Sequence, residues 1–158
     1  MLLLSLVKNK GFTLIELLVV FIIVGVLAAI ALPTMLNQTA KGREAEGKSN
    51  LGAINRAQQA YRFEKARFGN LGELSVVITG QYYTFSNGVV SDTFASHSAE
   101  ARANYTDDIR DYASAVALDA QGRLSNGVCE NNRPTDTIAP VTSSGTNIIC
   151  GANSNPVN

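Results

Sequence analysis

The sequence predicts an α+β protein in which a long N-terminal helix precedes a small antiparallel β-sheet. Residues 12–36 are almost entirely apolar, and residues 37–66 continue with apolar positions at helical spacing. After residue 66, short β-branched and aromatic runs alternate with turn-forming residues, which is typical of short strands. The helix is therefore expected to have a membrane-spanning half and an amphipathic half, and the amphipathic half is expected to pack on the sheet head.

The apolar half of the helix is long enough to span a bilayer, which needs about 20 apolar residues. Its plainly polar residues are Thr13, Glu16 and Thr34. No second stretch approaches this length, so the chain is expected to cross a membrane once. Lys8 and Lys10 flank the apolar segment on its N-terminal side, and positive flanks stay in the cytoplasm. The remainder of the chain is therefore placed outside the cytoplasm.

Three interpretations of this N-terminus are a secretory signal cut after Ala31, a plain single-span anchor, and a leader cut before the apolar run. Glu16 discriminates among them, because a carboxylate at bilayer depth costs roughly 2.5 kcal/mol or more and has no use in a signal or a plain anchor. The apolar run is also longer than the ~7–15 residues of a signal core. Both observations favour the third interpretation.

The motif Lys10-Gly11-Phe12-Thr13-Leu14-Ile15-Glu16, followed by Leu17-Leu18-Val19-Val20, resembles the prepilin motif of type IV pilins and type II secretion pseudopilins. The resemblance implies the type IV pilin fold and a leader peptide of residues 1–11. It also implies that a prepilin peptidase cuts between Gly11 and Phe12 and methylates the new amino terminus of Phe12.

The same resemblance gives roles to three residues of the apolar helix. Glu16 is implied to meet the terminal ammonium of a neighbouring subunit, which offsets the desolvation of both charges and drives assembly. Gly25 and Pro33 fall where many pilins carry residues that weaken the helix. The segment between them is implied to unwind within a filament, whereas a continuous, kinked helix is expected for an isolated subunit.

The amphipathic half of the helix is expected to end near Glu64, before Gly69-Asn70. Its glycines, Gly42, Gly47 and Gly52, permit either close packing or bending, and the sequence does not separate these. One face carries the residues expected to pack on the sheet, namely Ala40, Gly47, Leu51, Ile54, Ala57 and Tyr61.

The head, residues 67–158, is expected to form three to five antiparallel strands whose edges are partly covered by loops. The expected strands are residues 75–79, 82–85, 112–118 and 124–129, with a hairpin turn at 119–123. Residues 130–158 are mostly turn-forming and small polar residues, and the part after Cys150 is expected to be a disordered tail.

Cys129 and Cys150 are the two cysteines of the chain. Because the topology places them outside the cytoplasm, they are expected to form a disulfide. The bridge would close a loop of roughly 20 residues and stabilise the fold by about 3 kcal/mol. The segment resembles the disulfide-bounded C-terminal loop of pilins, which usually lies on the filament surface.

The charges are distributed unevenly along a chain of zero net charge. Between Lys41 and Arg67 seven bases face three acids, giving +4, whereas from Phe68 onward four bases face nine acids, giving −5. One interpretation is an ordinary solvated surface, and another is a basic stem that meets the acidic heads of neighbouring subunits. The basic stem would also allow weak DNA binding.

The sequence contains no metal-ligand spacing, phosphate loop or paired-carboxylate motif, so no enzyme, cofactor or metal is expected. His97 lies in a polar, Ser-rich stretch and is interpreted as exposed and inert. Asp107 and Asp108 are interpreted as a solvated turn rather than a Ca²⁺ site. Asn104-Tyr105-Thr106 fits the glycosylation pattern, which matches often by chance.

The resemblance implies a structural pilus subunit that serves adhesion, twitching motility or DNA uptake. Its implied partners are the prepilin peptidase, other pilin subunits, the inner-membrane assembly platform and, before assembly, membrane lipid. The implied location is the inner membrane with a cytoplasmic N-terminus, followed by an extracellular filament, or the periplasm for a pseudopilin.

Two alternatives remain open, a pseudopilin of a type II secretion system and a soluble secreted binding module. The pair Cys129 and Cys150 favours a pilus over the major pseudopilin, which typically lacks that bridge. The runs Gln59-Ala60-Tyr61-Arg62-Phe63-Glu64 and Tyr82-Tyr83-Thr84-Phe85 loosely resemble pilin-like proteins whose heads are of the secretion type.

Overall fold

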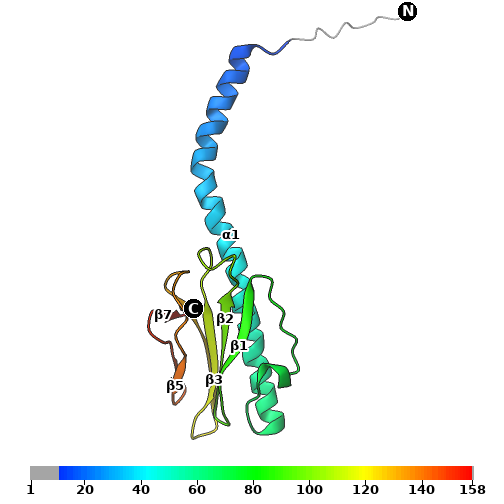
Figure 1. The fold of residues 1–158 in the computed structure, drawn as a ribbon, viewed down its shortest axis with the longest axis vertical. Helices are drawn as coiled ribbons and strands as arrows, with labels where there is room; N and C mark the ends of the chain where they lie inside the picture. Colours follow the sequence, from blue (N-terminus) through cyan, green and yellow to red (C-terminus); the bar gives the residue numbers. More distant parts are fainter. Residues whose placement is uncertain (1–10, 158) are drawn as a thin grey trace, which may run out of the picture. The chain divides into compact units, whose positions relative to one another are not determined.

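The computed structural model describes residues 11–157. They form one long helix, α1 (Leu14–Lys65), a short 3-10 helix, η1 (Leu71–Glu73), and seven strands (Figure 1). The chain divides into two compact units with the boundary after Gln38. The strands are β1 (Tyr83–Val90), β2 (Phe94–Ala101), β3 (Tyr112–Leu118), β4 (Leu124–Asn131), β5 (Thr142–Ser144), β6 (Asn147–Ile149) and β7 (Ser154–Pro156).

Helix α1 ends one residue beyond the predicted Glu64. Ala66 follows the helix with φ of 59°, and its N–H donates to the carbonyl of Arg62 at 3.0 Å. This left-handed residue satisfies one of the last helical carbonyls and stops the helix, as such residues commonly do. Pro33 lies inside α1, and the segment from Val26 to Leu32 is helical throughout, as expected for an isolated subunit.

The main sheet is antiparallel, with the strand order β1-β2-β3-β4-β7, and β5 and β6 form a separate hairpin. The predicted turn between β3 and β4 is confirmed. Asp119 Oδ1 accepts hydrogen bonds from the N–H groups of Gln121 and Arg123, and Gly122 supplies a positive φ of 78°. The α+β class and the antiparallel sheet are therefore as the sequence predicts.

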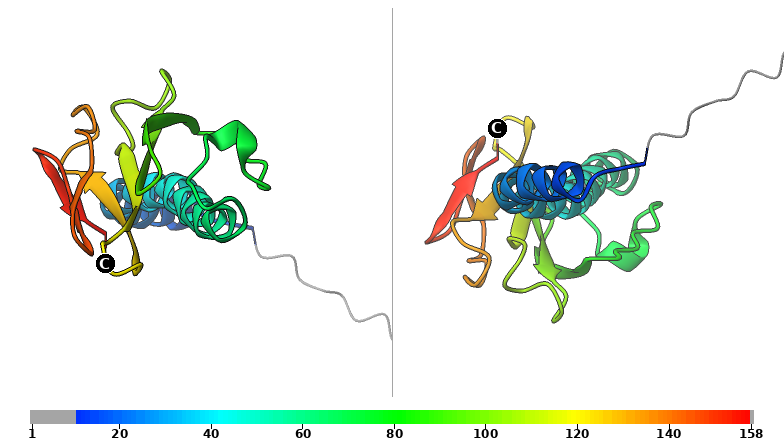
Figure 2. Two further views of the ribbon diagram at one scale, coloured as in Figure 1. Left: turned by 90° about the horizontal axis from the view of Figure 1, so that it is seen from below. Right: turned by 90° about the horizontal axis from the view of Figure 1, so that it is seen from above.

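The second unit is held together by the face of α1 predicted from the apolar spacing. Leu51 and Ile54 are fully buried in one cluster with Tyr83 of β1, Ala99 of β2 and Tyr112 of β3. Each such aliphatic side chain contributes about 1.5–3 kcal/mol on burial. Figure 2 shows the later part of α1 lying along one face of the sheet. Residues 39–65 of the helix thus form one layer and the five-stranded sheet the other.

The strand predicted at residues 75–79 is wrong. Residues 76–80 are without helix or strand assignment and pair with no strand. Val76 and Ile78 pack against the core of the second unit, and the Asn50 amide on α1 donates to the carbonyl of Thr79. The β-branched side chains of this segment therefore pack on the hydrophobic surface beside α1, and the segment does not join the sheet.

Strand β2 was not predicted, because its sequence is dominated by serine and alanine. Its inward positions, Ala95, His97 and Ala99, are all buried, and small side chains there let α1 approach the sheet. On the other side Ser98 and Glu100 are more exposed, but Ser96 is buried as well, so burial does not alternate clearly along the strand. The small residues of this strand also have low β-propensity.

The expectation of a disordered tail after Cys150 is also wrong. Strand β7 pairs with β4, with Cys129 opposite Pro156 and Asn131 opposite Ser154. The N–H of Val157 donates to the carbonyl of Val128 at 2.9 Å, which extends the pairing by one further bond. The turn-rich composition of this segment did not indicate a strand. The segment is ordered because it pairs with β4.

Candidate functional site

The first compact unit presents an apolar helical surface. Along α1, the large side chains from Leu14 to Leu36 are 48–90% exposed, and Phe12 ahead of the helix is 79% exposed. An 18-residue window of α1 has a mean hydropathy of 3.0, and none of it is buried. Within residues 11–157, this is the one helix long and apolar enough to cross a membrane, judged by length and composition. A helix that is apolar on every side needs lipid or protein around it.

Thr13 and Glu16 cap the start of this helix reciprocally. Glu16 Oε2 accepts hydrogen bonds from the Thr13 N–H at 3.0 Å and from the Thr13 hydroxyl at 2.9 Å. In return, the Glu16 N–H donates to Thr13 Oγ1 at 3.2 Å. This is the capping box formed by Thr-x-x-Glu at a helix start. The sequence analysis gave no role to Thr13. The Thr-x-x-Glu spacing of Thr13 and Glu16 ahead of an apolar run would have predicted this cap.

The other residues predicted for processing and helix weakening lie along the same unit. Gly11 and Phe12 are exposed and lie outside α1, ahead of the Thr13 cap. A Cβ added at Gly25 would meet nothing within 4 Å, so the described chain does not require glycine there. Lys8, Lys10 and the rest of the predicted leader before Gly11 lie outside the described residues.

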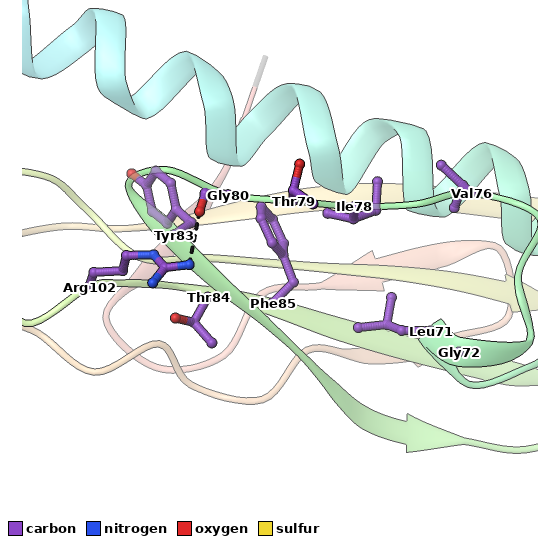
Figure 3. A pocket seen from close by; sticks show the side chains of 10 residues that line it. All are labelled: Leu71, Gly72, Val76, Ile78, Thr79, Gly80, Tyr83, Thr84, Phe85 and Arg102. Carbon is purple, nitrogen blue, oxygen red and sulfur yellow. Dashed lines mark hydrogen bonds between the residues drawn. The ribbon is translucent and has the colours of Figure 1, made fainter.

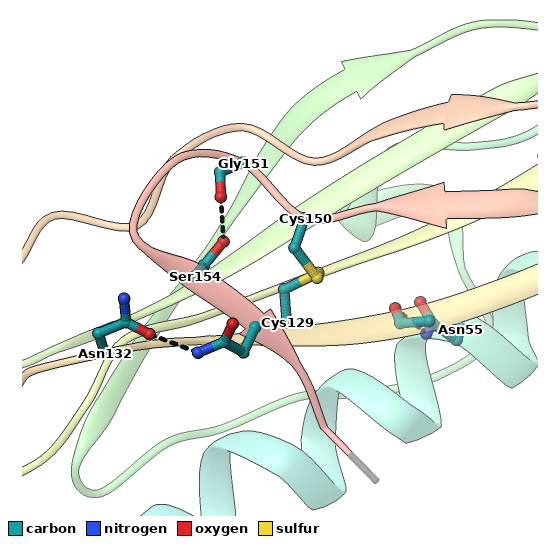
Figure 4. Close-up of a disulfide and its surroundings, with 8 residues drawn as sticks. Asn55, Cys129, Asn132, Cys150, Gly151 and Ser154 are labelled. Carbon is teal, nitrogen blue, oxygen red and sulfur yellow. Dashed lines mark hydrogen bonds between the residues drawn. A yellow bond between two sulfur atoms is a disulfide. The ribbon is translucent and has the colours of Figure 1, made fainter.

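The two cysteines form a disulfide in the structure. Cys129 on β4 and Cys150 just after β6 are 5.7 Å apart between Cα atoms (Figure 4). Cys129 is buried, together with Ala113, Ala115 and Val141. The bridge therefore attaches the β5–β6 hairpin to the main sheet.

Polar contacts hold the chain after the bridge. The Ser154 hydroxyl donates to the carbonyl of Gly151 at 2.7 Å, and the Asn155 amide donates to Asn132 Oδ1 (Figure 4). The N–H of Asn132 also donates to the carbonyl of Asn153, which has a positive φ of 58°. The disulfide and these contacts together make the C-terminal segment an ordered part of the head.

Several basic residues of the stem form ion pairs with acidic residues of the same chain. Arg43 pairs with Asp108 at 3.3 Å and lies over the rings of Tyr82 and Tyr105. Asp107 and Asp108 are exposed and lie in a turn, as expected, and Asp108 also forms this ion pair. Two further stem bases pair with acids outside α1, Lys48 with Glu130 at 3.2 Å and Arg67 with Glu73 at 2.6 Å.

His97 is buried, which contradicts its interpretation as an exposed residue. Its side chain is 1% exposed, and its Nε2 lies 2.8 Å from the Gln58 Nε2 atom on α1. Burial lowers the pKa of His97 to about 4 from its ordinary value of 6.5. Its position in β2, facing α1, explains the burial, and the missed strand explains the wrong interpretation.

A cavity of about 470 Å³ lies between residues 76–80 and β1 (Figure 3). Phe85 projects toward the 76–80 segment, and Arg102 donates to the carbonyl of Gly80 at 2.9 Å. Arg102 is the one charged residue among those lining the cavity. The lining carries the hydroxyl groups of Thr79, Tyr83 and Thr84, and no histidine, cysteine or carboxylate is among its residues.

Two protein families match this chain, one at its N-terminus and one over most of the remainder. The type IV pilin-like G and H family matches residues 44–151, and the prokaryotic N-terminal methylation motif matches residues 6–32. The first match covers more than half of the chain. The chain belongs to the type IV pilin-like family. The resemblance drawn from Gly11, Phe12 and Glu16 is therefore confirmed at the level of family.

Relatives of this pilin include both pilus and secretion proteins. It is 44% identical over 63 residues to the type IV major pilin protein PilA of Myxococcus xanthus (strain DK1622), which covers 40% of this chain and 29% of that protein. It is 31% identical over 61 residues to the type II secretion system core protein G of Escherichia coli (strain K12), covering 39% and 42%.

The pilin also matches the fimbrial protein EcpC of Eikenella corrodens, at 32% identity over 98 residues, covering 56% of this chain and 64% of that protein. The alignments thus span between 29% and 64% of these three relatives. The chain is thus similar both to a major pilin and to a secretion protein.

Proposed function

We propose that this pilin is the structural subunit of a type IV pilus and that it polymerises through residues 12–36 of its helix. The observation that carries the proposal is the exposed apolar surface of α1 between Leu14 and Leu36. Water contact with such a surface is unfavourable by about 25 cal/mol per Å². The surface therefore needs lipid while the subunit is stored in the inner membrane, and the helices of other subunits afterwards.

We further propose that a prepilin peptidase removes residues 1–11 and methylates Phe12. Gly11 and Phe12 are exposed and precede the first helical turn, so a protease can reach the backbone there. The absence of a side chain on Gly11 lets the backbone enter a narrow active site. Cleavage creates an ammonium on Phe12, four residues before Glu16.

Glu16 then has two competing partners in the proposed mechanism. In the isolated chain its carboxylate accepts hydrogen bonds from Thr13, which satisfies the oxygen but leaves the charge unneutralised. A neighbouring subunit offers a terminal ammonium, and opposite charges stabilise each other strongly where water is scarce. Capping by Thr13 thus keeps Glu16 ordered before assembly, and charge neutralisation favours the assembled state.

Two matched substitutions separate the charge of Glu16 from its capping role. Glu16→Gln removes the charge but retains an oxygen that can complete the capping box with Thr13. Thr13→Ala removes the hydroxyl partner and keeps the charge. If charge pairing drives assembly, Glu16→Gln and Glu16→Ala abolish filaments and leave the processed subunit in the membrane, whereas Thr13→Ala still assembles.

The readout is electron microscopy of surface filaments, together with membrane fractionation of the subunit in each strain. Normal filaments from both Glu16 variants would refute the role of the charge. Loss of filaments in Thr13→Ala with normal filaments in Glu16→Gln would show that capping, not charge, controls assembly.

Intact-mass measurement of the mature N-terminus tests the processing step independently. A chain that starts at a methylated Phe12 supports the proposal, and a chain that starts at Leu32 would leave the soluble binding module as the explanation. A Gly11→Val variant is expected to remain uncut, whereas Gly25→Ala, which meets no neighbouring atom, is expected to be cut normally.

The second candidate function is a pseudopilin of a type II secretion system, which the similarity to secretion core protein G favours. Deletion of the gene separates the two functions. Loss of surface pili with normal secretion of exoproteins indicates a pilin, and loss of secretion with normal pili indicates a pseudopilin. An altered number of pili would indicate a minor subunit.

A further inference from the structure

The Gln58 side chain clamps the segment that follows α1 onto the helix. Its Oε1 accepts a hydrogen bond from the N–H of Gly69 at 3.0 Å, and its Nε2 donates to the carbonyl of the same residue. Gln58 is fully buried, so no solvent competes for these bonds. We call this pair of bonds the Gln58 clamp.

The Gln58 clamp determines which ring nitrogen of neutral His97 carries the proton. The Nε2 group of Gln58 has a second hydrogen, and the His97 Nε2 atom lies 2.8 Å away. The two bonds to Gly69 hold the Gln58 amide in one orientation, with its NH₂ group toward His97. The His97 Nε2 atom must therefore accept a hydrogen bond from this NH₂ group. The neutral ring therefore carries its proton on Nδ1, which is buried without a hydrogen-bond partner among residues 11–157.

We propose that the Gln58 clamp is an acid-sensitive latch, in which a proton on His97 Nε2 removes the acceptor for the Gln58 amide and so releases Gly69. Two N–H groups would then face each other at this contact. Rotating the Gln58 amide by half a turn would place its oxygen beside the protonated His97 ring, but it would break both hydrogen bonds to Gly69. The protonated state is therefore incompatible with the closed clamp, and Gly69 loses both of its hydrogen bonds to α1.

Among the described residues, Glu100 is the carboxylate that lines a pocket together with His97, and no charged group is among the causes that shift the His97 pKa. In register, β1 places Asn87 opposite His97 and β3 places Ser114 there, and both are neutral. Ser114 Oγ is itself buried without a partner in the described part of the chain. On α1, the titratable side chains within one turn after Gln58 on the same face are Tyr61, a phenol, and Arg62, a cation.

The segment that carries Gly69 brings one base and one acid, Arg67 and Glu73. They pair with each other at 2.6 Å, so the carboxylate is already neutralised. Burial is accordingly the cause that lowers the pKa of His97, with no charged partner among its causes. A buried ring without an anion resists protonation as long as the clamp stays closed.

The direction of the pH effect follows from linkage. An opened or unfolded chain binds a proton on His97 below its ordinary pKa of 6.5, whereas the closed chain binds it only near pH 4. The clamp is therefore fully stable above about pH 6.5 and loses stability as the pH falls toward 4. Each pH unit in that window shifts the equilibrium toward the open form by up to about tenfold.

The test uses the full chain in detergent micelles, with no added histidine tag. Because His97 is the single histidine of the sequence, ¹⁵N labelling of histidine gives an assigned ring spectrum. We expect the Nδ1–H tautomer at pH 7 and titration well below pH 6. An Nε2–H tautomer, or titration near the ordinary value, would overturn the proposal without any substitution being needed.

Hydrogen exchange at Gly69 provides the second measurement. Its protection factor, which corrects for the intrinsic pH dependence of exchange, is expected to fall about tenfold per unit between pH 6 and pH 4.5. In His97→Gln, the side-chain oxygen keeps an acceptor for Gln58 but does not titrate in this range. Constant protection in that variant supports the latch, whereas the same fall in both chains would assign the effect to other groups and refute it.

Discussion

Gly47 on α1 lies directly under the ring of Tyr83 on β1. A Cβ built on Gly47 would stand 3.1 Å from two ring carbons of Tyr83 and 3.2 Å from the ring of Tyr112. Both tyrosines are fully buried, and the Tyr83 hydroxyl donates to the carbonyl of Arg110 at 2.8 Å, so neither ring has room to retreat. Of the stem glycines, Gly47 is thus the one that the packing of helix on sheet requires.

Gly47→Ala is expected to destabilise the head by up to about 2 kcal/mol. Alanine improves helix propensity by about 1 kcal/mol, but overpacking against the two rings costs about 1–3 kcal/mol. Gly42→Ala is the matched control, because nothing lies within 4 Å of its added Cβ. The control is expected to stabilise by up to about 1 kcal/mol. Urea unfolding measures both, and equal effects in the two variants would contradict the packing argument.

Glu46→Ala is expected to destabilise the junction before β1 by about 1–3 kcal/mol, the cost of leaving buried donors unpaired. Glu46 Oε1 accepts from the N–H groups of Tyr82 at 3.0 Å and Tyr83 at 3.3 Å. Glu46→Gln keeps an acceptor oxygen and should retain most of the stability. Denaturant midpoints of the three chains check this, and an equal loss in Gln and Ala would indicate that the charge, not the acceptor, matters.

Replacing Cys129 and Cys150 together by serine is expected to lower the free energy of unfolding by about 3 kcal/mol. The bridge closes a sequence separation of 21 residues and ties the β5–β6 hairpin to β4. Because β7 pairs with β4 beyond the bridge, its amide protection should fall more than that of β2. Thermal unfolding with and without reductant gives the size of the effect, and an unchanged midpoint under reducing conditions would refute it.

Glu73 is expected to titrate near pH 2. The hydrogen bond from Arg67 is the largest cause of its lowered pKa, and the N–H of Asn70 adds to it. Because the folded pKa lies below the ordinary value of 4.5, the stabilisation is complete above about pH 4.5 and is lost as the pH falls toward 2. Carboxyl NMR titration checks this, and Arg67→Met should move the midpoint toward 4.5. This window overlaps that of His97 only between pH 4.5 and about 4, so the two effects separate outside that range.

The long helix and the apolar segment could be predicted from the sequence because their signals are local. Helical spacing identified Leu51 and Ile54 as core residues, and a run of apolar residues identified the helix of membrane-spanning length. Gly11, Phe12 and Glu16 belong to a short contiguous motif, so no tertiary contact was needed to find them. The role of Thr13 was also readable from its spacing to Glu16, but was missed.

Strand pairing could not be predicted in the same way, because it depends on a partner elsewhere in the chain. Residues 75–79 have β-branched side chains but lie beside α1, and β2 has weak propensity but pairs on both sides. Strand β7 exists because β4 offers it backbone groups. Propensity describes how a residue fits a pleated surface and does not specify which segments meet.

By itself the sequence determined the membrane-length helix, its carboxylate and processing motif, and the helix face that enters the core. Only the tertiary structure decided that Gly47 is a contact point, that His97 is buried against Gln58, and that Lys48 meets Glu130. The physical reason is distance along the chain. Hydropathy and helix capping act over a few residues, whereas burial and pairing join residues that come together only when α1 packs on the sheet.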